Sequence, residues 1–283
     1  MKYRIFYYLL ALCVASIAMT ACSEDEDLTP SYKDVNGFEP AADDNSATAQ
    51  LRRDFFKETG SYLLFDDKLT TTSTNGQPEL IEPGWSMIGS SGNDYQYQYI
   101  TDIDEQREAT ALIKQYLLPR FSFKMFSYLL VNELSYIYYG DKETATNYLG
   151  TRTLVISMNM GEAYDSPEEY FSSMMIDIIQ GKLDYESPLL KPFYAYCEQY
   201  YGYDYEDFGW EDKPSQEELW ELGFTGGNSY YFYYKKKDYT TWLELVLNNT
   251  EEEFSELYGD YPVMMAKYRT LKEIIEQQGF VLK

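Results

Sequence analysis

The stretch Arg-Thr-Leu-Val-Ile-Ser-Met at residues 152–158, followed by Ser-Pro-Glu-Glu at residues 166–169, carries the clearest structural signals in the chain. The Leu-Val-Ile block between polar flanks predicts a short buried strand. A serine cap, a proline in the first turn and a glutamate three residues after the serine predict that a helix begins at Ser166. A strand therefore leads into a helix, which Gly181 is expected to close.

Three further strands are expected before this stretch. Tyrosine alternates with glutamine over residues 95–99, which is the two-residue period of a strand with one aromatic face. Apolar blocks at residues 62–65 and 128–134 predict the other two. Residues 67–93 are rich in Thr, Ser, Asn, Gly and Pro and are expected to form a long loop. The sheet should therefore be small, with about four strands.

Helices are expected on both sides of these strands. Apolar residues at helical spacing over 51–56 precede Gly60, and residues 104–118 also have a helical pattern. Ser215 and Thr250 are each followed three residues later by glutamate, so two capping boxes start helices in the second half. The sequence predicts a single α+β domain with a small sheet and a mostly helical C-terminal half.

Composition excludes several classes of function. The 283 residues include 47 acidic and 23 basic side chains, giving a formal charge of −24, so a phosphate backbone would be repelled. Nucleic-acid binding is therefore not expected. The chain has no histidine, which removes the commonest general base, the Ser/His and Cys/His nucleophile pairs and the usual zinc ligand. Tyrosine is in excess, with 31 residues.

The N-terminus has the pattern of a bacterial export signal. Basic residues precede an apolar stretch that is too short for a comfortable membrane span, and residues 1–21 are expected to be removed. Met-Thr-Ala-Cys at residues 19–22 resembles the lipobox of bacterial lipoproteins, which implies that Cys22 is acylated and becomes the first residue of the mature chain. The alternative is ordinary signal cleavage with an incidental cysteine. Acyl chains would hold the protein on the outer membrane.

An acidic run follows the cysteine and consists of Glu24, Asp25, Glu26 and Asp27. Such a run stays solvated, so residues 22–46 are expected to form a flexible tether ahead of a domain at residues 47–283. The run also resembles the export signal of surface-exposed lipoproteins in Bacteroidetes-type bacteria. That resemblance implies a lipid-anchored protein on the outer face of the outer membrane.

Three segments carry a family resemblance: Leu-Arg-Arg-Asp-Phe-Phe at 51–56, Gly-Ser-Tyr-Leu-Leu-Phe-Asp-Asp at 60–67 and Leu-Pro-Arg-Phe at 118–121. In their order and in these short signatures they resemble the zinc-binding metallopeptidase lipoproteins of Bacteroidetes-type bacteria. The resemblance spans nearly the whole domain and implies a zincin-like fold. In that family a helix carries H-E-x-x-H, whose histidines hold zinc and whose glutamate activates water.

The residues of that motif are missing here. Laid on the helix at 166–181, the motif places Ser173 and Asp177 at the histidine positions and Met174 at the glutamate position. A later family signature, Glu-Asp-Phe-Ala-Glu, corresponds to Lys-Asp-Tyr-Thr-Thr at residues 237–241, where only Asp238 is kept. The resemblance therefore implies a degenerate member. No catalytic residue, metal or cofactor is predicted, and the helix is expected simply to pack.

Clustered tyrosines suggest a binding surface, because exposed aromatic rings stack on sugar faces and anchor protein interfaces. The alternative is that these rings replace Phe and Leu in the core and its rim. The candidates for the surface are Tyr200, Tyr201, Tyr203, Tyr205, Tyr230 and Tyr231.

Two functions follow from the sequence. The first is a catalytically inactive, surface-anchored binding or accessory component of an outer-membrane system for glycan or peptide uptake, with a protein or glycan partner. The second is a carboxylate-based glycan hydrolase, or a glycan-binding protein that uses exposed tyrosines. Catalytic carboxylate pairs lie far apart in sequence and leave no local signature, so the sequence leaves both possibilities open.

Overall fold

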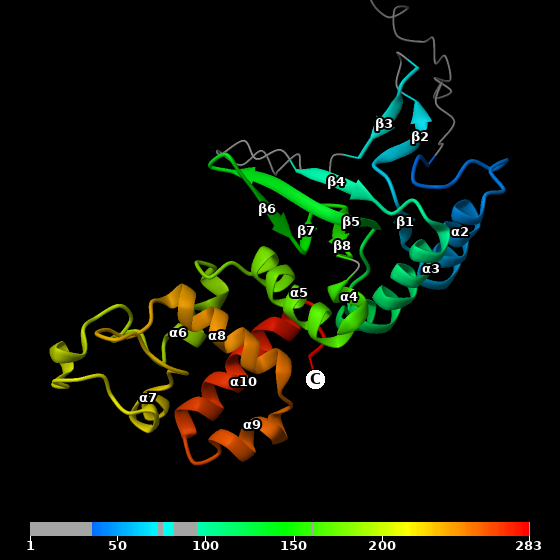
Figure 1. The fold of residues 1–283 in the computed structure, drawn as a ribbon. Coiled ribbons are helices and arrows are strands. Elements are labelled where there is room, and N and C mark those ends of the chain that lie inside the picture. Colours follow the sequence, from blue (N-terminus) through cyan, green and yellow to red (C-terminus); the bar gives the residue numbers. More distant parts are fainter. Residues whose placement is uncertain (1–35, 73–75, 82–94, 160, 283) are drawn as a thin grey trace, which may run out of the picture. The chain divides into compact units, whose positions relative to one another are not determined.

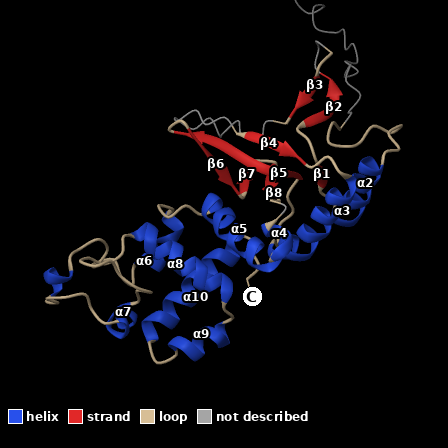
Figure 2. Ribbon diagram, in the orientation of Figure 1, coloured by secondary structure: helices blue, strands red, loops and turns tan. Residues whose placement is uncertain are grey.

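The computed structural model describes residues 36–72, 76–81, 95–159 and 161–282. Those from Gly37 onward belong to one compact unit. The fold is mixed α+β, as the sequence predicts, with a small sheet followed by a helical C-terminal half (Figures 1 and 2). Residues 1–21, Cys22 and the acidic run at 24–27 lie outside the described residues.

Residues 37–46, which the sequence analysis assigned to the tether, belong to the compact unit. The carbonyl of Gly37 accepts a hydrogen bond from the Thr70 amide at 2.9 Å, and the Phe38 ring packs edge-on against Phe126. Arg53 donates to two carbonyls of the same segment. These contacts are made largely by backbone atoms, so the composition of the segment did not indicate them.

The main sheet is built around one long strand, β5 (Ser127–Tyr138). It pairs in parallel with β1 (Tyr62–Leu64) and β8 (Thr153–Ser157), and antiparallel with β4 (Gln96–Tyr99) and β6 (Asp141–Ala145). The remaining strands are β7 (Asn147–Leu149), which pairs with β8, and a separate hairpin of β2 (Lys68–Thr72) and β3 (Pro78–Leu80).

The four expected strands correspond to β1, β4, β5 and β8, and the six-stranded sheet of the described residues adds β6 and β7. Strand β6 was not predicted because its residues, Asp-Lys-Glu-Thr-Ala, are mostly exposed and show no apolar alternation. The expected loop at 67–93 contains the hairpin of β2 and β3. These additions come from pairing with a partner strand and not from a local pattern.

Alternation along β5 divides the core between the two faces of the sheet. Tyr128 and Leu130 belong to the large core that the helices share, whereas Leu129 and Val131 belong to a smaller cluster on the opposite face. Half-buried tyrosines of β4 cover part of that smaller cluster. Figure 1 shows the helices gathered against the first of these faces. The fold is therefore a sheet with one helix-covered face.

The N-terminal half of the described chain contributes α2 (Ala47–Thr59), α3 (Ile103–Leu112) and α4 (Glu162–Asp165). The helix expected over 104–118 comprises α3, a π-helical turn at Ile113–Leu117 and a 3-10 turn at Leu118–Arg120. The C-terminal half contributes α5 (Pro167–Lys182), α6 (Lys191–Tyr194), α7 (Gln216–Leu222), α8 (Lys235–Asn248), α9 (Glu251–Tyr258) and α10 (Pro262–Gln277), with 3-10 turns at Pro188–Leu190 and Tyr205–Phe208.

The helix ends match the sequence predictions in part. Both expected capping boxes form, at Ser215 and Thr250. Ser166 precedes α5, but its side chain makes no capping hydrogen bond. Gly181 lies inside α5, which continues to Lys182. Within the described residues, no helix has both the length and the apolar character needed to cross a membrane.

We expect opposite effects from alanine at Gly60 and at Gly181. Gly60 ends α2 with φ +70°, and an added Cβ would lie 2.5 Å from Nζ of Lys124. Gly60→Ala should therefore lower the free energy of unfolding by about 1 kcal/mol. Gly181 is helical and its added Cβ would meet only Leu149 Cβ at 3.9 Å, so Gly181→Ala should raise that free energy by about 0.5 kcal/mol. Urea unfolding of both variants measures this, and changes of the same sign would contradict it.

Candidate functional site

The residues that the family resemblance places at the motif positions lie on α5, one of the helices packed under the sheet. Ser173 and Asp177 are exposed one turn apart, whereas Met174 is fully buried in the main core. Asp177 accepts a hydrogen bond from Oγ1 of Thr146 at 2.9 Å, and the carbonyl of Thr146 accepts from the Ser157 amide of β8. Neighbouring atoms remove part of the hydration of Asp177 and so raise its pKa, and the Thr146 hydroxyl opposes this shift. Asp177 is thus connected to the sheet through Thr146.

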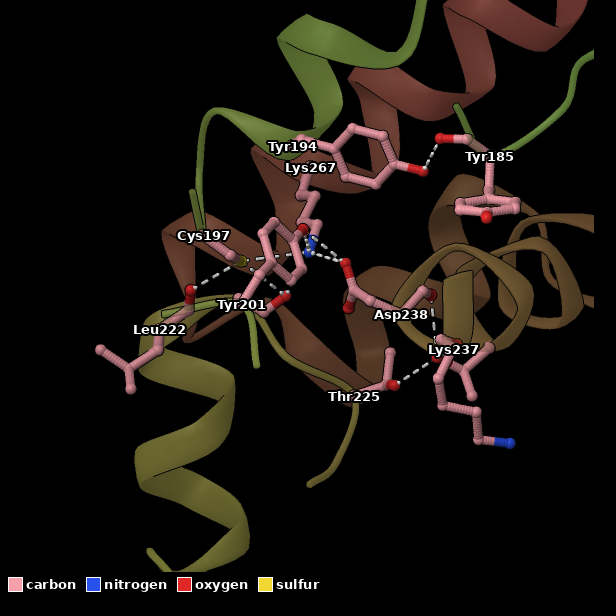
Figure 3. Close-up of polar contacts among 11 residues, drawn as sticks. Tyr185, Tyr194, Cys197, Tyr201, Leu222, Thr225, Lys237, Asp238 and Lys267 are labelled. Atoms are coloured by element: carbon pink, nitrogen blue, oxygen red, sulfur yellow. Dashed lines mark hydrogen bonds and ion pairs between the residues drawn. The ribbon is translucent and has the colours of Figure 1, made fainter. Parts of the chain in front are cut away.

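The structure gives Asp238 a different environment from that of Ser173 and Asp177. Asp238 lies in the first turn of α8 and is completely buried, as is Lys267 of α10. Oδ2 of Asp238 lies 2.7 Å from Nζ of Lys267 and accepts a hydrogen bond from Oη of Tyr201 at 2.7 Å (Figure 3). Within the described residues, no hydrogen bond joins Asp238 to α5. The positions aligned with the family motif therefore do not converge on one site.

Lys267 is the centre of a buried polar cluster. Its ammonium donates to the Gly223 carbonyl at 3.0 Å, to Sγ of Cys197 at 3.1 Å and, more weakly, to Oη of Tyr201 at 3.4 Å (Figure 3). Aromatic rings surround it, with ring centroids 4.6 Å away for Phe193, 5.2 Å for Trp242 and 5.3 Å for Phe224. Cation–π attraction adds to the ion pair in such surroundings. The cluster joins α7, α8, α10 and the segment that follows α6.

Burial determines the protonation of this cluster. Desolvation raises the pKa of Asp238, while the Lys267 ammonium and the Tyr201 hydroxyl oppose the shift. Desolvation also raises the pKa of Cys197 to about 11 and raises the pKa of Tyr201. The thiol and the phenol therefore stay protonated at neutral pH. With Lys267 and Asp238 both fully buried, the cluster braces the helices and presents no group to a substrate.

Two buried polar atoms in or beside this cluster, one on Asp238 and one on Trp242, lack a good hydrogen bond. The indole N–H of Trp242 is close enough to Asp238 to oppose, in part, the rise in pKa that burial causes. Even so, neither Oδ1 of Asp238 nor Nε1 of Trp242 makes a well-aligned hydrogen bond to the described residues. The buried Asp238 carboxylate therefore depends strongly on the hydrogen bonds that its other oxygen, Oδ2, accepts from Lys267 and Tyr201.

An acidic cleft lies between α5 and α8, with a volume of about 490 Å³. Ser173 lines it together with three carboxylates, those of Glu168, Glu169 and Glu244. Two interhelical hydrogen bonds hold the neighbouring surfaces together, from Ser172 to Asn248 and from Gln180 to Thr240. Across the residues that the structure describes, no three His, Cys, Asp or Glu side chains lie close enough together to hold a metal ion.

The candidate tyrosines fall into buried and exposed groups. Tyr205 is only 2% exposed and donates to the Asn228 carbonyl, and Tyr201 belongs to the Lys267 cluster, so neither can form a binding surface. Tyr200 and Tyr231 are half-buried. Tyr203 and Tyr230 are 56% and 79% exposed. The proposed surface therefore loses two of its six tyrosines because their rings fill a satellite core.

Two exposed aromatic residues that the sequence analysis did not select complete this region. Tyr234 is 57% exposed and packs over Gly202, where an added Cβ would lie 2.4 Å from the ring. Phe208 is 38% exposed, and its ring contacts that of Tyr203. We call Tyr203, Phe208, Tyr230 and Tyr234 the aromatic surface. The sequence signal for the last member was the tyrosine run at 230–234.

Comparison of the chain with protein-family models, with curated proteins and with solved structures gives no match.

We expect the buried ion pair to be essential for stability. Lys267→Met leaves the Asp238 carboxylate buried without its cation and should lower the free energy of unfolding by about 3–5 kcal/mol. Lys267→Met combined with Asp238→Asn removes the buried charge and should recover part of that loss. Lys237→Met, at an exposed position beside Asp238, is the matched control and should change stability by less than about 0.5 kcal/mol. Urea unfolding decides the point, and equal losses for both lysines would contradict it.

Proposed function

We propose that this protein is a lipid-anchored binding protein of the outer membrane whose aromatic surface contacts glycan chains. The observation that carries the proposal is the grouping of large exposed rings on one segment, between α6 and α8. Exposed aromatic groups of this kind mark binding sites, because flat rings bring contact area at low entropic cost. The tyrosine hydroxyls can also bond to the polar rim of a sugar.

The backbone beneath the aromatic surface is braced, which supports the proposal. The Tyr205 amide donates to the Tyr230 carbonyl at 3.1 Å, and the Phe232 amide donates to the Tyr203 carbonyl at 3.0 Å. Below these bonds the rings of Phe232 and Phe224 stack with centroids 5.3 Å apart. A rigid support reduces the entropy lost when a ligand binds.

A binding role agrees with the chemistry of the degenerate motif. Met174 is a buried thioether that cannot accept a proton, Ser173 is a poor zinc ligand, and Asp238 is already paired with Lys267. These side chains offer no peptidase chemistry. From the sequence resemblance alone, we propose that the scaffold is zincin-like and that the protein serves as an accessory component of nutrient uptake. The partner would be a glycan, or a protein of the uptake system.

We expect alanine at the aromatic surface to weaken binding without affecting folding. In a screen of oligosaccharides against the mature chain, Tyr230→Ala and Tyr203→Ala should each lower affinity about three- to tenfold, because each removes one stacking ring. Tyr139→Ala is the control, since this tyrosine is 92% exposed on the turn between β5 and β6. Equal losses at all three positions would contradict the assignment.

The same oligosaccharide screen also tests whether the protein is a hydrolase that uses the glutamates of the acidic cleft. Cleavage of an oligosaccharide that is abolished by Glu244→Gln, with binding retained, would replace the binding proposal by a carboxylate-based hydrolase.

We expect Cys22→Ala to release the protein from membranes into the soluble fraction of cells. The acyl chains are the proposed anchor, and no helix of the described residues could replace them. Fractionation followed by detection of the protein measures this. Accessibility to protease added to intact cells checks the surface assignment, and full protection would contradict it.

A further inference from the structure

A second cavity, of about 440 Å³, lies where the segment after Gly37 crosses α2 and β1. Its size falls in the range of small-molecule sites. Phe38, Phe56 and Tyr62 form much of its wall, and Arg52 and Arg53 supply its positive charge. All of these residues are far in sequence from the aromatic surface, so the cavity is an independent feature of the fold.

The rings of the aromatic wall stack on one another and leave Phe56 partly open. The rings of Phe56 and Tyr62 are parallel within 17° with centroids 4.5 Å apart, and the Phe38 ring lies 5.8 Å from that of Tyr62. Phe56 is 38% exposed although it lies in α2 close to the core residue Phe55. A ring that stays this open beside a cavity offers a contact face to a ligand.

Both arginines bond to backbone carbonyls of the fold. Arg52 donates to the carbonyls of Leu63 and Phe38, and Arg53 donates to those of Ala41 and Asp44. These bonds use two of the five N–H groups on each guanidinium. Within the described part of the chain, neither arginine has a carboxylate at ion-pair distance, although the protein has 47 acidic residues.

The guanidinium donors of the cavity favour a ligand that carries a carboxylate. Both arginines are half-buried. Burial lowers the pKa of Arg52, and the carboxylates of Asp44 and Asp66 oppose this shift from beyond ion-pair distance. Glu39 also lines the cavity, where its carboxylate accepts a hydrogen bond from Tyr62 at 3.2 Å. The carboxylates of Asp44 and Asp66 therefore balance part of the positive charge from a distance, and Glu39 does so in the wall. A ligand carboxylate would be held by direct hydrogen bonds to the guanidinium groups.

We propose that this cavity binds a small molecule that carries one carboxylate on a ring with an apolar face. The ring lies against the open side of Phe56, and the carboxylate accepts the N–H groups of Arg52 and Arg53 that the backbone leaves unused. Two sources have this chemistry, an acidic sugar such as a uronic acid and an aromatic acid. The alternative to ligand binding is a purely structural role, in which the arginines only hold residues 38–44 against α2.

The test uses the mature chain, with glucuronate and benzoate as probes and with glucose and benzamide as their uncharged counterparts. Isothermal titration at millimolar probe concentration should detect at least one of the two acids, with at least about tenfold weaker binding of its uncharged counterpart. Glucuronate alone would identify an acidic sugar, benzoate alone an aromatic acid, and both the shared chemistry. Failure of both acids to bind would overturn the proposal.

Variants separate the site from a structural role. Arg53→Gln and Phe56→Ala should each weaken binding of the acid at least about tenfold, because one removes a charge-assisted donor and the other a stacking ring. Arg107→Gln, which removes an exposed arginine paired with Asp104 on α3, is the matched control and should bind like the parent. Circular dichroism checks that each variant is folded, and Phe56→Ala decides the case if Arg53→Gln unfolds. Unchanged binding in Phe56→Ala, or an equal loss in Arg107→Gln, would overturn the site.

Discussion

The arrangement of the C-terminal helices depends on the buried ion pair between Lys267 and Asp238. Both side chains are fully buried at a separation of 2.7 Å, and the ammonium also binds the Gly223 carbonyl, which follows α7. A pair of this kind adds little to stability compared with well-packed apolar residues, but it tolerates few alternative arrangements, because each charge would be stranded without the other. We infer that it fixes how α7, α8 and α10 meet.

The segment between α6 and α8 follows from this constraint. Tyr201 is held inside by its hydrogen bond to Asp238, and Tyr205 and Phe232 fill the satellite core beside it. With those rings committed to the interior, the neighbouring Tyr203 and Tyr230 remain outside. The aromatic surface is thus the outer side of a segment whose inner side is fixed by packing. Its rigidity and its exposure have the same origin.

The possible binding regions of the molecule differ in the charge of the side chains that line them. The chain as a whole has a formal charge of −24, and the cleft between α5 and α8 adds three glutamates to one surface. The cavity lined by Arg52 and Arg53 is a local exception in this field. An anion would be repelled at long range over most of the surface and held only at short range by direct hydrogen bonds to guanidinium. Such a site favours ligands whose apolar ring contributes to binding.

Local patterns in the sequence were enough to predict the α+β class, the strand of β8 and the capping boxes at Ser215 and Thr250, because each rests on residues within one turn or one strand. The same patterns failed where the outcome depended on a distant partner. The polar strand β6 exists through its pairing with β5, and residues 37–46 are held by arginines of α2.

The candidate site shows the same division. The sequence by itself determined that the chain has no histidine and that Ser173, Met174 and Asp177 stand where the family resemblance places the motif, and these residue types fix the chemistry that the side chains can perform. Only the tertiary structure decided that Asp238 faces Lys267, twenty-nine residues away in the chain, and that adjacent tyrosines divide between core and surface. The physical reason is that residue type sets what a side chain can do, whereas burial and charge pairing arise from elements that are remote in sequence.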